Sequence, residues 1–402
     1  MSSADEPHAG PLSGIRVLEL SLALTGPYIG ALFADQGADV VKVERPDIGD
    51  ILRWIGPSVN GLSAVFRVCN RGKKSIAIDV RTDAGREIAL ELAARADVVI
   101  QNFRPGVADR LGLGYADVVA VNPDVVYASL TGFGEVGPYR DRSAYDTVIQ
   151  AYGGVASSQA SPDIGEPIFL QQVIADKVTA LYASQAVTAA LFARATGRGG
   201  QHVHLSMVDA VVSFLWTDAA GNEVLLDSDN SQPSSFTSGF TPFRFIDGWG
   251  VVTPISDSDF SGMCRCLDAP GADDPRLQTA ELRNQHRPLM AEVMAACYAG
   301  AEKLTVREAT DRFEAADVPY AMIVSPKDLP DDPHAIEMGL FEERDDPVVG
   351  RVRIPRHPAL FDGTPAQLAG PAPKLGEHTR EVLRIVGRGD QEAALRESGV
   401  SA

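Results

Sequence analysis

Residues 15–45, IRVLELSLALTGPYIGALFADQGADVVKVER, decide the fold of this chain. Two apolar runs, Ile15–Leu20 and Ala38–Glu44, predict β-strands. The segment Pro27–Gln36 between them predicts a helix. A strand, a helix and a second strand in close succession form a compact βαβ unit, in which the two strands run parallel.

The same alternation continues along the chain. Further strands and helices are expected in turn at Ser75–Val80, Ala84–Ala96, Asp97–Gln101, Val107–Val121 and Val125–Leu130. Alternation of this kind is typical of a mostly parallel sheet with helices on both faces. The predicted fold class is therefore α/β, with a Rossmann-like, mostly parallel sheet.

Cationic or polar groups follow three of these strands. Arg45 follows the second strand, Arg81 the third, and Asn102-Phe103-Arg104 the fourth. The carboxyl ends of the strands line the ligand crevice of an open α/β sheet, so these groups should converge there. Because 54 Asp and Glu against 36 Lys and Arg give a formal net charge of −18, an anionic, nucleotide-bearing ligand must bind through this local cluster.

Two lysines are expected away from that cluster. Lys73 and Lys74 precede the third strand, which places them at the opposite end of the sheet as structural or peripheral residues.

The length of the chain favours two domains. At 402 residues it exceeds the size at which a single core usually stops growing. The composition turns polar at residues 227–235, which marks the expected boundary. We expect a large Rossmann-like domain over 1–225, a smaller α+β domain over 226–345, and a C-terminal segment, 346–402, that returns to the large domain.

Composition excludes several classes of protein. The chain is 45% hydrophobic and 22% charged, has no apolar run of membrane-spanning length, and starts with acidic residues where a signal peptide would be basic. We expect a cytoplasmic protein without a membrane partner. Its four cysteines are too few for a disulfide framework, Cys264-Arg265-Cys266 does not have zinc-site spacing, and the acidity argues against nucleic acid. No metal site is predicted.

The usual cofactor and hydrolase motifs are missing from the sequence. The turn after the first strand, SLALTGP at residues 21–27, lacks the G-x-G-x-x-G spacing of a dinucleotide site. Neither a phosphate-binding G-x-x-x-x-G-K-[ST] loop nor a G-x-S-x-G nucleophile elbow occurs.

Asp176 has two possible roles. It stands at the start of a long helix expected up to Gly197, whose predicted buried face comprises Val178, Leu181, Tyr182, Ala186, Ala189 and Phe192. Asp is a favoured helix N-cap. A carboxylate is also ionised at neutral pH and can attack an electrophile without a general base. Periodicity alone leaves both roles open, as it does for Tyr145-Asp146, which can be a hydrogen-bonding pair near a site or the start of a helix.

From Pro11 almost to its end, the chain resembles the class III CoA-transferases, the family of formyl-CoA transferase and of the CaiB/BaiF proteins. The resemblance is carried by PLSGIRVLEL, TGPYIGALFADQGADVVKVERP, NRGKKSIAIDV, ADVVIQNFRPGVADRLGLGY, SAYDTVIQAYGG, TGRGGQHVHLSMVDA and PKLGEHTREVL. It implies that Asp176 is the catalytic nucleophile. It also implies CoA contacts at Arg45, Ile78, Arg81, Asn102, Phe103, Arg104, Arg110 and Tyr145.

The resemblance implies a ping-pong transfer through an aspartyl anhydride and an aspartyl-CoA thioester. The substrates are then a carboxylic acid and an acyl-CoA, which is the coenzyme A thioester. No tightly bound cofactor is expected. The family also forms interlocked homodimers, so the same assembly is expected here.

Two departures from formyl-CoA transferase concern the acyl group. Leu24 stands where that enzyme has a glutamine, and its glycine-run loop is replaced by residues 234–240, SSFTSGF. The predicted substrate pocket comprises Ala23, Leu24, Thr25 and Phe240. Because leucine cannot hydrogen-bond oxalate, we expect a less polar acyl group than oxalyl.

Two other functions compete with transfer. The racemase branch of the same superfamily has a histidine at the position of Tyr145, and tyrosine, with a reference pKa near 10, is a poor base for proton abstraction. A CoA-binding protein without catalysis would use Asp176 only as a helix cap.

Overall fold

The computed structural model describes residues 10–160, 165–227, 235, 237 and 240–401. The chain divides into two compact units, Met1–Val224 with Gly339–Ala402, and Leu225–Met338. Of the residues 234–240 considered above, positions 234, 236, 238 and 239 lie outside the described residues. The boundary expected at 345 falls inside β12 (Phe341–Asp346), which pairs with β13 (Gly350–Pro355) in the first unit.

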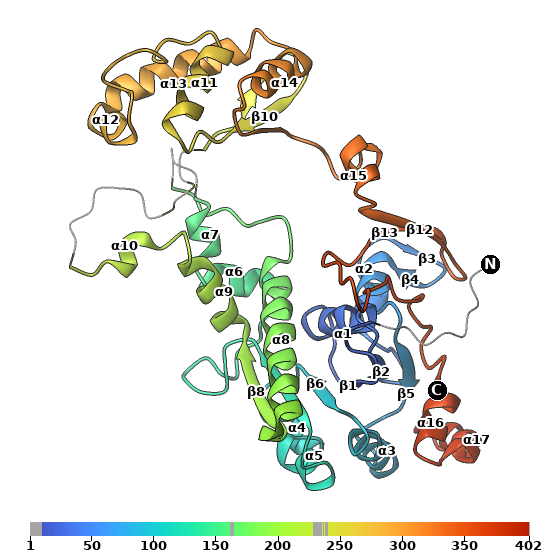
Figure 1. Cartoon of the computed structure of the whole chain (residues 1–402). Helices are drawn as coiled ribbons and strands as arrows, with labels where there is room; N and C mark the ends of the chain where they lie inside the picture. Colours follow the sequence, from blue (N-terminus) through green and yellow to red (C-terminus); the bar gives the residue numbers. More distant parts are fainter. Residues whose placement is uncertain (1–9, 161–164, 228–234, 236, 238–239, 402) are drawn as a thin grey trace. The chain divides into compact units, whose positions relative to one another are not determined.

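A six-stranded sheet organises the first unit (Figure 1). Its strands are β1 (Arg16–Glu19), β2 (Asp39–Glu44), β5 (Lys74–Ala77), β6 (Val98–Gln101), β7 (Val126–Thr131) and β8 (Gln201–Ser206). All neighbouring strands are parallel, in the order β5-β2-β1-β6-β7-β8. This is the strand order of the Rossmann fold, so the predicted α/β class is confirmed. The order reverses between β1 and β6, which places the ligand crevice beyond the carboxyl ends of these two strands.

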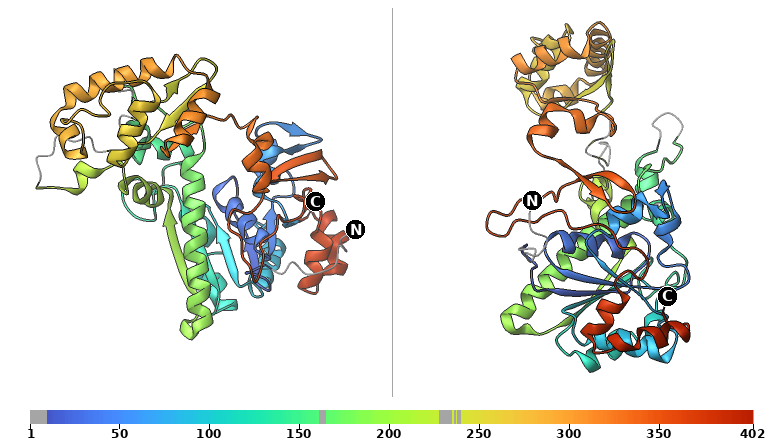
Figure 2. Two further views of the ribbon diagram at one scale, coloured as in Figure 1. Left: turned by 45° about the horizontal axis from the view of Figure 1, so that its top comes forward. Right: turned by 90° about the vertical axis from the view of Figure 1, so that its right-hand side faces the viewer.

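Helices cover both faces of the sheet (Figures 1 and 2). On one face lie α1 (Thr25–Asp35) and α8 (Ile174–Ala193), and on the other α3 (Asp83–Ala93), α5 (Tyr115–Val121) and α16 (Thr379–Ile385). The C-terminal helix α16 contributes Val382 and Leu383 to the apolar cluster that also contains residues of α3 and β5, so the end of the chain completes the core of its first unit. The first unit also contains α2 (Ala64–Cys69), α4 (Val107–Arg110), α6 (Asp146–Tyr152), α7 (Val155–Ser158), α9 (Met207–Trp216), α10 (Gly221–Val224), α17 (Glu392–Glu397), β3 (Ser58–Val59) and β4 (Leu62–Ser63).

One predicted helix is two helices in the structure. The segment expected to be helical from Val107 to Val121 is interrupted between α4 and α5. Gly112 adopts φ +68° there, a left-handed conformation that glycine accepts without a Cβ clash. The glycines therefore stop the first helix, and Gly114 is the N-cap of the second.

The predicted buried face of α8 is largely wrong. Leu181 is 53% exposed and Phe192 71% exposed, although Val178 is buried as expected. The face that packs in the core instead carries small residues, among them Ala180 and Ala183. Small side chains let α8 approach α1 closely, which leaves the larger apolar side chains on the opposite face.

The second unit is a small α+β structure. Its antiparallel sheet has the order β11-β10-β9, formed by β9 (Phe243–Arg244), β10 (Trp249–Val252) and β11 (Tyr320–Met322). Its helices are α11 (Asp257–Cys266), α12 (Ala280–Gln285), α13 (Arg287–Ala301), α14 (Val306–Ala315) and α15 (Pro333–Glu337). Phenylalanines 243, 260 and 313 fill its core, so the smaller unit buries its own apolar cluster.

Within the described ranges, no helix combines the length and the apolar character needed to span a membrane.

Candidate active site

Asp176 lies where the first turns of two helices meet. It is the third residue of α8, and its carboxylate accepts a hydrogen bond from the hydroxyl of Thr25, the first residue of α1. A helix N-terminus carries a partial positive charge and unpaired N–H groups. Two such termini therefore face one carboxylate, an arrangement that stabilises negative charge there.

A different carboxylate accepts a hydrogen bond from the first turn of α8. The backbone N–H of Asp176 donates to Asp146 Oδ2 at 3.0 Å, and Asp146 is itself 5% exposed. Val173 occupies the N-cap position and makes no side-chain cap bond. Asp176 itself lies inside α8 and not at its N-cap position, and its carboxylate is directed to Thr25.

The environment of Asp176 raises its pKa to about 6. Burial is the largest cause, since it penalises the charged carboxylate, and the neighbouring charge of Asp146 acts in the same direction. Hydrogen bonds from Thr25 oppose this shift by stabilising the anion. The carboxylate is therefore mostly ionised at neutral pH, yet more basic than an ordinary aspartate.

The loop that carries Thr25 is held by Asn102, at the end of β6. The Asn102 side chain accepts from the Leu22 N–H at 2.8 Å and donates to the Leu22 carbonyl at 2.6 Å. This pair of bonds spans the point where the strand order reverses. Asn102 thus connects the two strand ends that border the crevice.

The same loop is strained at Ala23, which has φ +62°. This left-handed conformation is unfavourable for alanine, and such strain concentrates at functional sites. Asp50 accepts from the Ala23 N–H at 3.1 Å, and Lys42 Nζ donates to the Ser21 carbonyl at 2.8 Å. Side chains from β2 and the segment after it therefore fix the loop conformation.

Behind the loop lies a buried network of four charges that the sequence analysis missed. Lys42 Nζ contacts Glu19 Oε1 at 2.8 Å and Asp50 Oδ2 at 2.9 Å, while Lys73 Nζ contacts Glu19 Oε2 at 2.6 Å. All four side chains are buried. Buried strands of a parallel sheet normally read as continuous apolar runs, so the charged Glu19 and Lys42 inside such runs were the available signal.

The expected position of Lys73 is wrong. Its amine contacts Glu19, the last residue of β1, and the Pro27 carbonyl at 2.7 Å in α1. The side chain therefore lies at the carboxyl end of the sheet. Lys74 points the other way and pairs with Asp39, the first residue of β2, at 3.1 Å.

Arg45 and Arg81 lie at the carboxyl edge as expected, but each has a carboxylate partner. Arg45 pairs with Asp47 at 2.6 Å and Arg81 with Asp79 at 2.6 Å. Arg81 holds the pKa of Asp79 below its usual range, mainly through its hydrogen bond, and Arg45 adds to this effect. The four groups are thus close together, and both arginines are exposed.

The other predicted CoA contacts differ in how they are presented. Ile78 is 1% exposed in an apolar cluster against which the partly buried Phe103 also packs, so a ligand can meet only the main chain of Ile78. Arg104 donates to Ser143 Oγ at 2.6 Å. Arg110 ends α4 on an exposed position, and Tyr145, the N-cap residue of α6, is 68% exposed.

A cavity of about 350 Å³ lies between α1, α2 and α8. This volume is within the range of small-molecule sites. Its lining residues are Leu24, Tyr28, Ala64, Val65, Val68, Cys69, Val173 and Lys177. Leu24, one of the predicted pocket residues, therefore forms part of its wall, next to Thr25. Phe240 belongs to the second unit and is 42% exposed.

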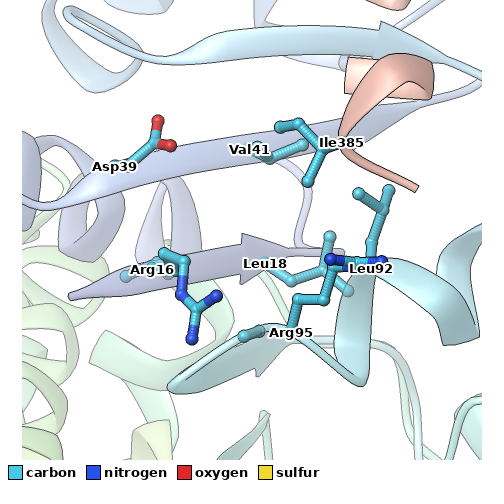
Figure 3. Close-up of a pocket in the computed structure, with 9 residues that line it drawn as sticks. Arg16, Leu18, Asp39, Val41, Leu92, Arg95 and Ile385 are labelled. Carbon is cyan, nitrogen blue, oxygen red and sulfur yellow. The ribbon is translucent and has the colours of Figure 1, made fainter. Parts of the chain in front are cut away.

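A second cavity, of about 40 Å³, is unrelated to this crevice (Figure 3). Arg16 and Asp39, which line it, are the first residues of β1 and β2, so it lies at the amino end of the sheet. Its volume has room for a few water molecules only.

Comparison with known proteins identifies the family. Residues 12–379 match the model of CoA-transferase family III. The chain is 33% identical to succinyl-CoA:glutarate CoA-transferase of Mus musculus over 388 residues, covering 95% of this chain and 88% of that protein. It is 34% identical to succinate–glutarate CoA-transferase of Agrobacterium fabrum over 387 residues, which cover 93% of this chain and 95% of that protein. A solved structure of a CaiB/BaiF family protein from Brucella suis matches with a TM-score of 0.80 at 32% identity. The match covers 94% of this chain and 100% of that chain.

These matches span nearly the whole chain and agree with its parallel sheet, so they define an enzyme that uses acyl-CoA substrates. The chain belongs to CoA-transferase family III, the CaiB/BaiF family. It is an acyl-CoA:carboxylate CoA-transferase.

Proposed function

We propose that this enzyme moves CoA between two carboxylic acids through covalent intermediates on Asp176. The observation that carries the proposal is the Asp176 carboxylate, which accepts a hydrogen bond from Thr25 where two helix N-termini meet, while Asp146 accepts from the Asp176 backbone N–H. An ionised carboxylate in this position is a nucleophile that needs no general base.

The cycle begins when a carboxylate oxygen of Asp176 attacks the thioester carbon of the donor. The C–S bond breaks, CoA leaves as a thiolate, and an acyl-aspartyl anhydride remains. The thiolate then attacks the aspartyl carbonyl carbon, the anhydride C–O bond breaks, and the donor acid leaves as a carboxylate. An acceptor carboxylate reverses these steps on the aspartyl-CoA thioester, so that acyl-CoA is formed and the Asp176 carboxylate returns.

The helix termini aid the steps in which negative charge develops. Attack on the thioester produces a tetrahedral oxyanion beside the first turns of α1 and α8, where N–H groups stabilise it. The rigid loop around Ala23 keeps Thr25 in place without reorganisation during the reaction. Holding thiolate and anhydride together favours transfer over hydrolysis.

CoA is proposed to bind along the carboxyl edge of the sheet. Arg45, Arg81, Arg104 and Arg110 would meet its phosphates, with Tyr145, Asn102, Phe103 and the main chain of Ile78 nearby. The exposed pairs Arg45–Asp47 and Arg81–Asp79 contribute little by themselves, so a phosphate can replace the carboxylate as partner. A bidentate arginine–phosphate contact is stronger.

An interlocked homodimer is proposed as the working assembly. Apolar side chains of α8 and the adjoining α9 are exposed in the single chain, among them Leu181, Phe192, Phe214 and Trp216. Exposed apolar surface of this kind marks an interaction site. A second copy of this chain is the proposed occupant.

Capture of the intermediate tests the mechanism. The protein is incubated with an acyl-CoA and hydroxylamine, digested with trypsin, and the peptide 143–177 is analysed by fragmentation mass spectrometry. The expected product is a hydroxamate on Asp176, absent in Asp176→Asn. Asp146 lies in the same peptide and serves as an internal control. CoA exchange at an undiminished rate in Asp176→Ala would overturn the proposal, and binding without any adduct would favour a non-catalytic CoA-binding protein.

Racemisation is the weaker alternative, because exposed Tyr145 stands where the racemase branch has a histidine and a tyrosine hydroxyl is a poor base for proton abstraction. Deuterium incorporation at the α-carbon of a 2-methylacyl-CoA in D₂O would favour the racemase over the transferase.

A further inference from the structure

Three polar side chains, Gln101, Ser129 and His202, form a hydrogen-bonded relay across the neighbouring strands β6, β7 and β8. Gln101, the last residue of β6, is 6% exposed, and Ser129, its register partner on β7, is 4% exposed. Buried strands of a parallel sheet usually carry apolar side chains, because a buried polar group without a hydrogen bond is costly. The partners of these polar groups therefore bear on what the relay does.

The relay begins at the turn after β6. The backbone N–H of Phe103 donates to Gln101 Oε1 at 2.8 Å, and Gln101 Nε2 donates to Ser129 Oγ at 2.9 Å. A backbone N–H can only donate, so the amide oxygen of Gln101 faces Phe103 and its NH₂ group faces Ser129. Ser129 Oγ lies 2.8 Å from His202 Nε2 on β8. Because Oγ accepts from Gln101, the single hydroxyl proton of Ser129 is left to donate to His202.

The ring of His202 is held in place and is suited to accept this hydrogen bond. It stacks on Tyr115 of α5 with 4.4 Å between the ring centroids, and it meets the Tyr127 ring edge-on at 5.2 Å. Burial is the main cause that lowers the pKa of His202 to about 4, and the neighbouring His204 acts in the same direction. The imidazole of His202 is therefore neutral at neutral pH, with a free lone pair on Nε2 and its proton on Nδ1.

The turn that the relay holds joins the two parts of the proposed site. Residues 102–104 belong to no helix or strand, so side-chain hydrogen bonds fix their conformation. Asn102 makes both of its hydrogen bonds to the Leu22 backbone from this turn. Phe103 and Arg104 are proposed CoA contacts. A displaced Gln101 amide would therefore move groups that meet CoA.

We propose that His202 is a positioning residue for CoA binding, because through the polar relay it fixes the turn after β6 in the conformation that CoA meets. The imidazole acts through the relay and not by contact with the ligand. The inference rests on the proposed function, since it takes Phe103 and Arg104 as part of the CoA site. It does not depend on covalent chemistry at Asp176.

Calorimetric titration with CoA tests the role of His202. His202→Phe keeps an aromatic ring beside Tyr115 but removes the acceptor for Ser129, so the Kd of CoA should rise at least about fivefold. His202→Gln places an amide oxygen near the position of Nε2 and should recover most of the affinity. His204→Phe is the matched control. His204 lies two residues along the same strand and its Nδ1 contacts Glu135 at 3.0 Å, so this variant should keep the wild-type Kd.

Steady-state kinetics separate positioning from a general loss of structure. In His202→Phe, the KM of the acyl-CoA used for hydroxylamine trapping should rise, while kcat at saturation should stay within about twofold of wild type. The reason is that the contacts of Asp176 with Thr25 and Asp146 lie on other elements. A partly unfolded variant would instead lower kcat and leave KM unchanged, because it contains less active enzyme. That result, or an equal loss of CoA affinity in His204→Phe, would overturn the inference.

Arg104→Met separates this inference from the proposed CoA site. If Arg104→Met weakens CoA binding and His202→Phe does not, CoA binds at the proposed edge and the role of His202 is wrong. If neither variant changes the Kd, the proposed edge is wrong and the inference fails with it. Weaker CoA binding in His202→Phe supports the inference even if no adduct forms on Asp176, in which case only the mechanism fails.

Neutron diffraction from the wild-type protein at neutral pH is a test that needs no variant, should His202→Phe fail to fold. The expected result is a Ser129 hydroxyl hydrogen directed at His202, with a hydrogen on Nδ1 of the imidazole and none on Nε2. A hydrogen on Nε2 would show that His202 does not accept from Ser129, and the inference would be wrong.

Discussion

At the scale of single residues, the proposed chemistry depends on the protonation of Asp176. Its pKa is raised to about 6, mainly by burial and further by Asp146, while Thr25 acts against the shift. A carboxyl with a raised pKa is neutral below that value and ionised above it. The proposed nucleophile is therefore lost as the pH falls through about 6, whereas an ordinary aspartate has a pKa near 3.8.

The pH dependence of intermediate formation follows from this shift. Hydroxylamine-trapped turnover should fall about tenfold between neutral pH and about pH 5, since only about a tenth of Asp176 is ionised one unit below its pKa. Single-turnover rates across this range measure the effect.

Asp146→Asn is the matched variant for that experiment. Asparagine keeps an oxygen that can accept from the Asp176 N–H but removes the negative charge. The fall in rate should then move to lower pH. A wild-type rate that stays flat down to about pH 5 would contradict the raised pKa of Asp176.

At the scale of elements, the loop between β1 and α1 depends on buried charge. The buried network has no net charge, since it contains Glu19, Lys42, Asp50 and Lys73. Two of its members, Lys42 and Asp50, also hydrogen-bond the backbone of the loop. Burial lowers the pKa of Lys73 to about 8, although Glu19 opposes that shift. The charges are thus tolerated inside the protein only as a complete set.

Removal of one charge from this network should destabilise the fold. Glu19→Gln keeps the side-chain size but leaves two buried lysines with one carboxylate, and about 3–5 kcal/mol of unfolding free energy should be lost. Urea unfolding provides the measurement. Glu381→Gln is the control: Glu381 pairs with Lys74 at the surface, and its loss should cost less than about 1 kcal/mol.

A second substitution checks that the effect is electrostatic. If Glu19→Gln does not yield folded protein, the double variant Glu19→Gln, Lys73→Met restores neutrality and should recover stability relative to Glu19→Gln alone. Equal losses for Glu19→Gln and Glu381→Gln would mean that the network does not hold the loop.

At the scale of the whole molecule, the exposed apolar face of α8 bears on assembly. Ala180, Ala183 and the other small residues pack in the core, while Phe192, at 71% exposure, faces away from it. In the proposed homodimer this face is covered by the partner subunit. The 42.8 kDa chain should therefore sediment at about twice its mass.

Introducing a charge on that face should disrupt the proposed dimer. Phe192→Glu is expected to reduce the dimer fraction in analytical ultracentrifugation, because a carboxylate would be buried without a partner. Val136→Glu, at a position that is 83% exposed in a loop, is the control and should leave the mass unchanged. A wild-type protein that sediments as a monomer would contradict the proposed dimer, whatever the masses of the two variants.

The proposed interlocking of the two chains predicts slow subunit exchange between dimers. Linked chains cannot exchange partners without opening, so mixed tagged and untagged dimers should form hybrids only after unfolding and refolding. Free exchange under native conditions would indicate an ordinary dimer.

The local order of the fold could be read from the sequence. Apolar runs such as Val17–Glu19 and Val98–Ile100 contain the strands, and their alternation with helices predicted a parallel sheet, because periodicity and crossover rules depend on neighbouring residues. The placement of Arg45 and Asn102 at one edge followed from the parallel direction of the strands alone. Membership of the CoA-transferase family was likewise legible in motifs.

Tertiary structure alone decided which of these groups meet. Nothing local indicates that Asp146 accepts from the Asp176 N–H, that Lys73 reaches the end of β1, or that α8 buries its small residues and exposes Phe192. A helical period shows that faces differ but does not say which face finds a partner. Likewise, a charged residue has no assigned counterion until the chain has folded, since burial and distance set that choice.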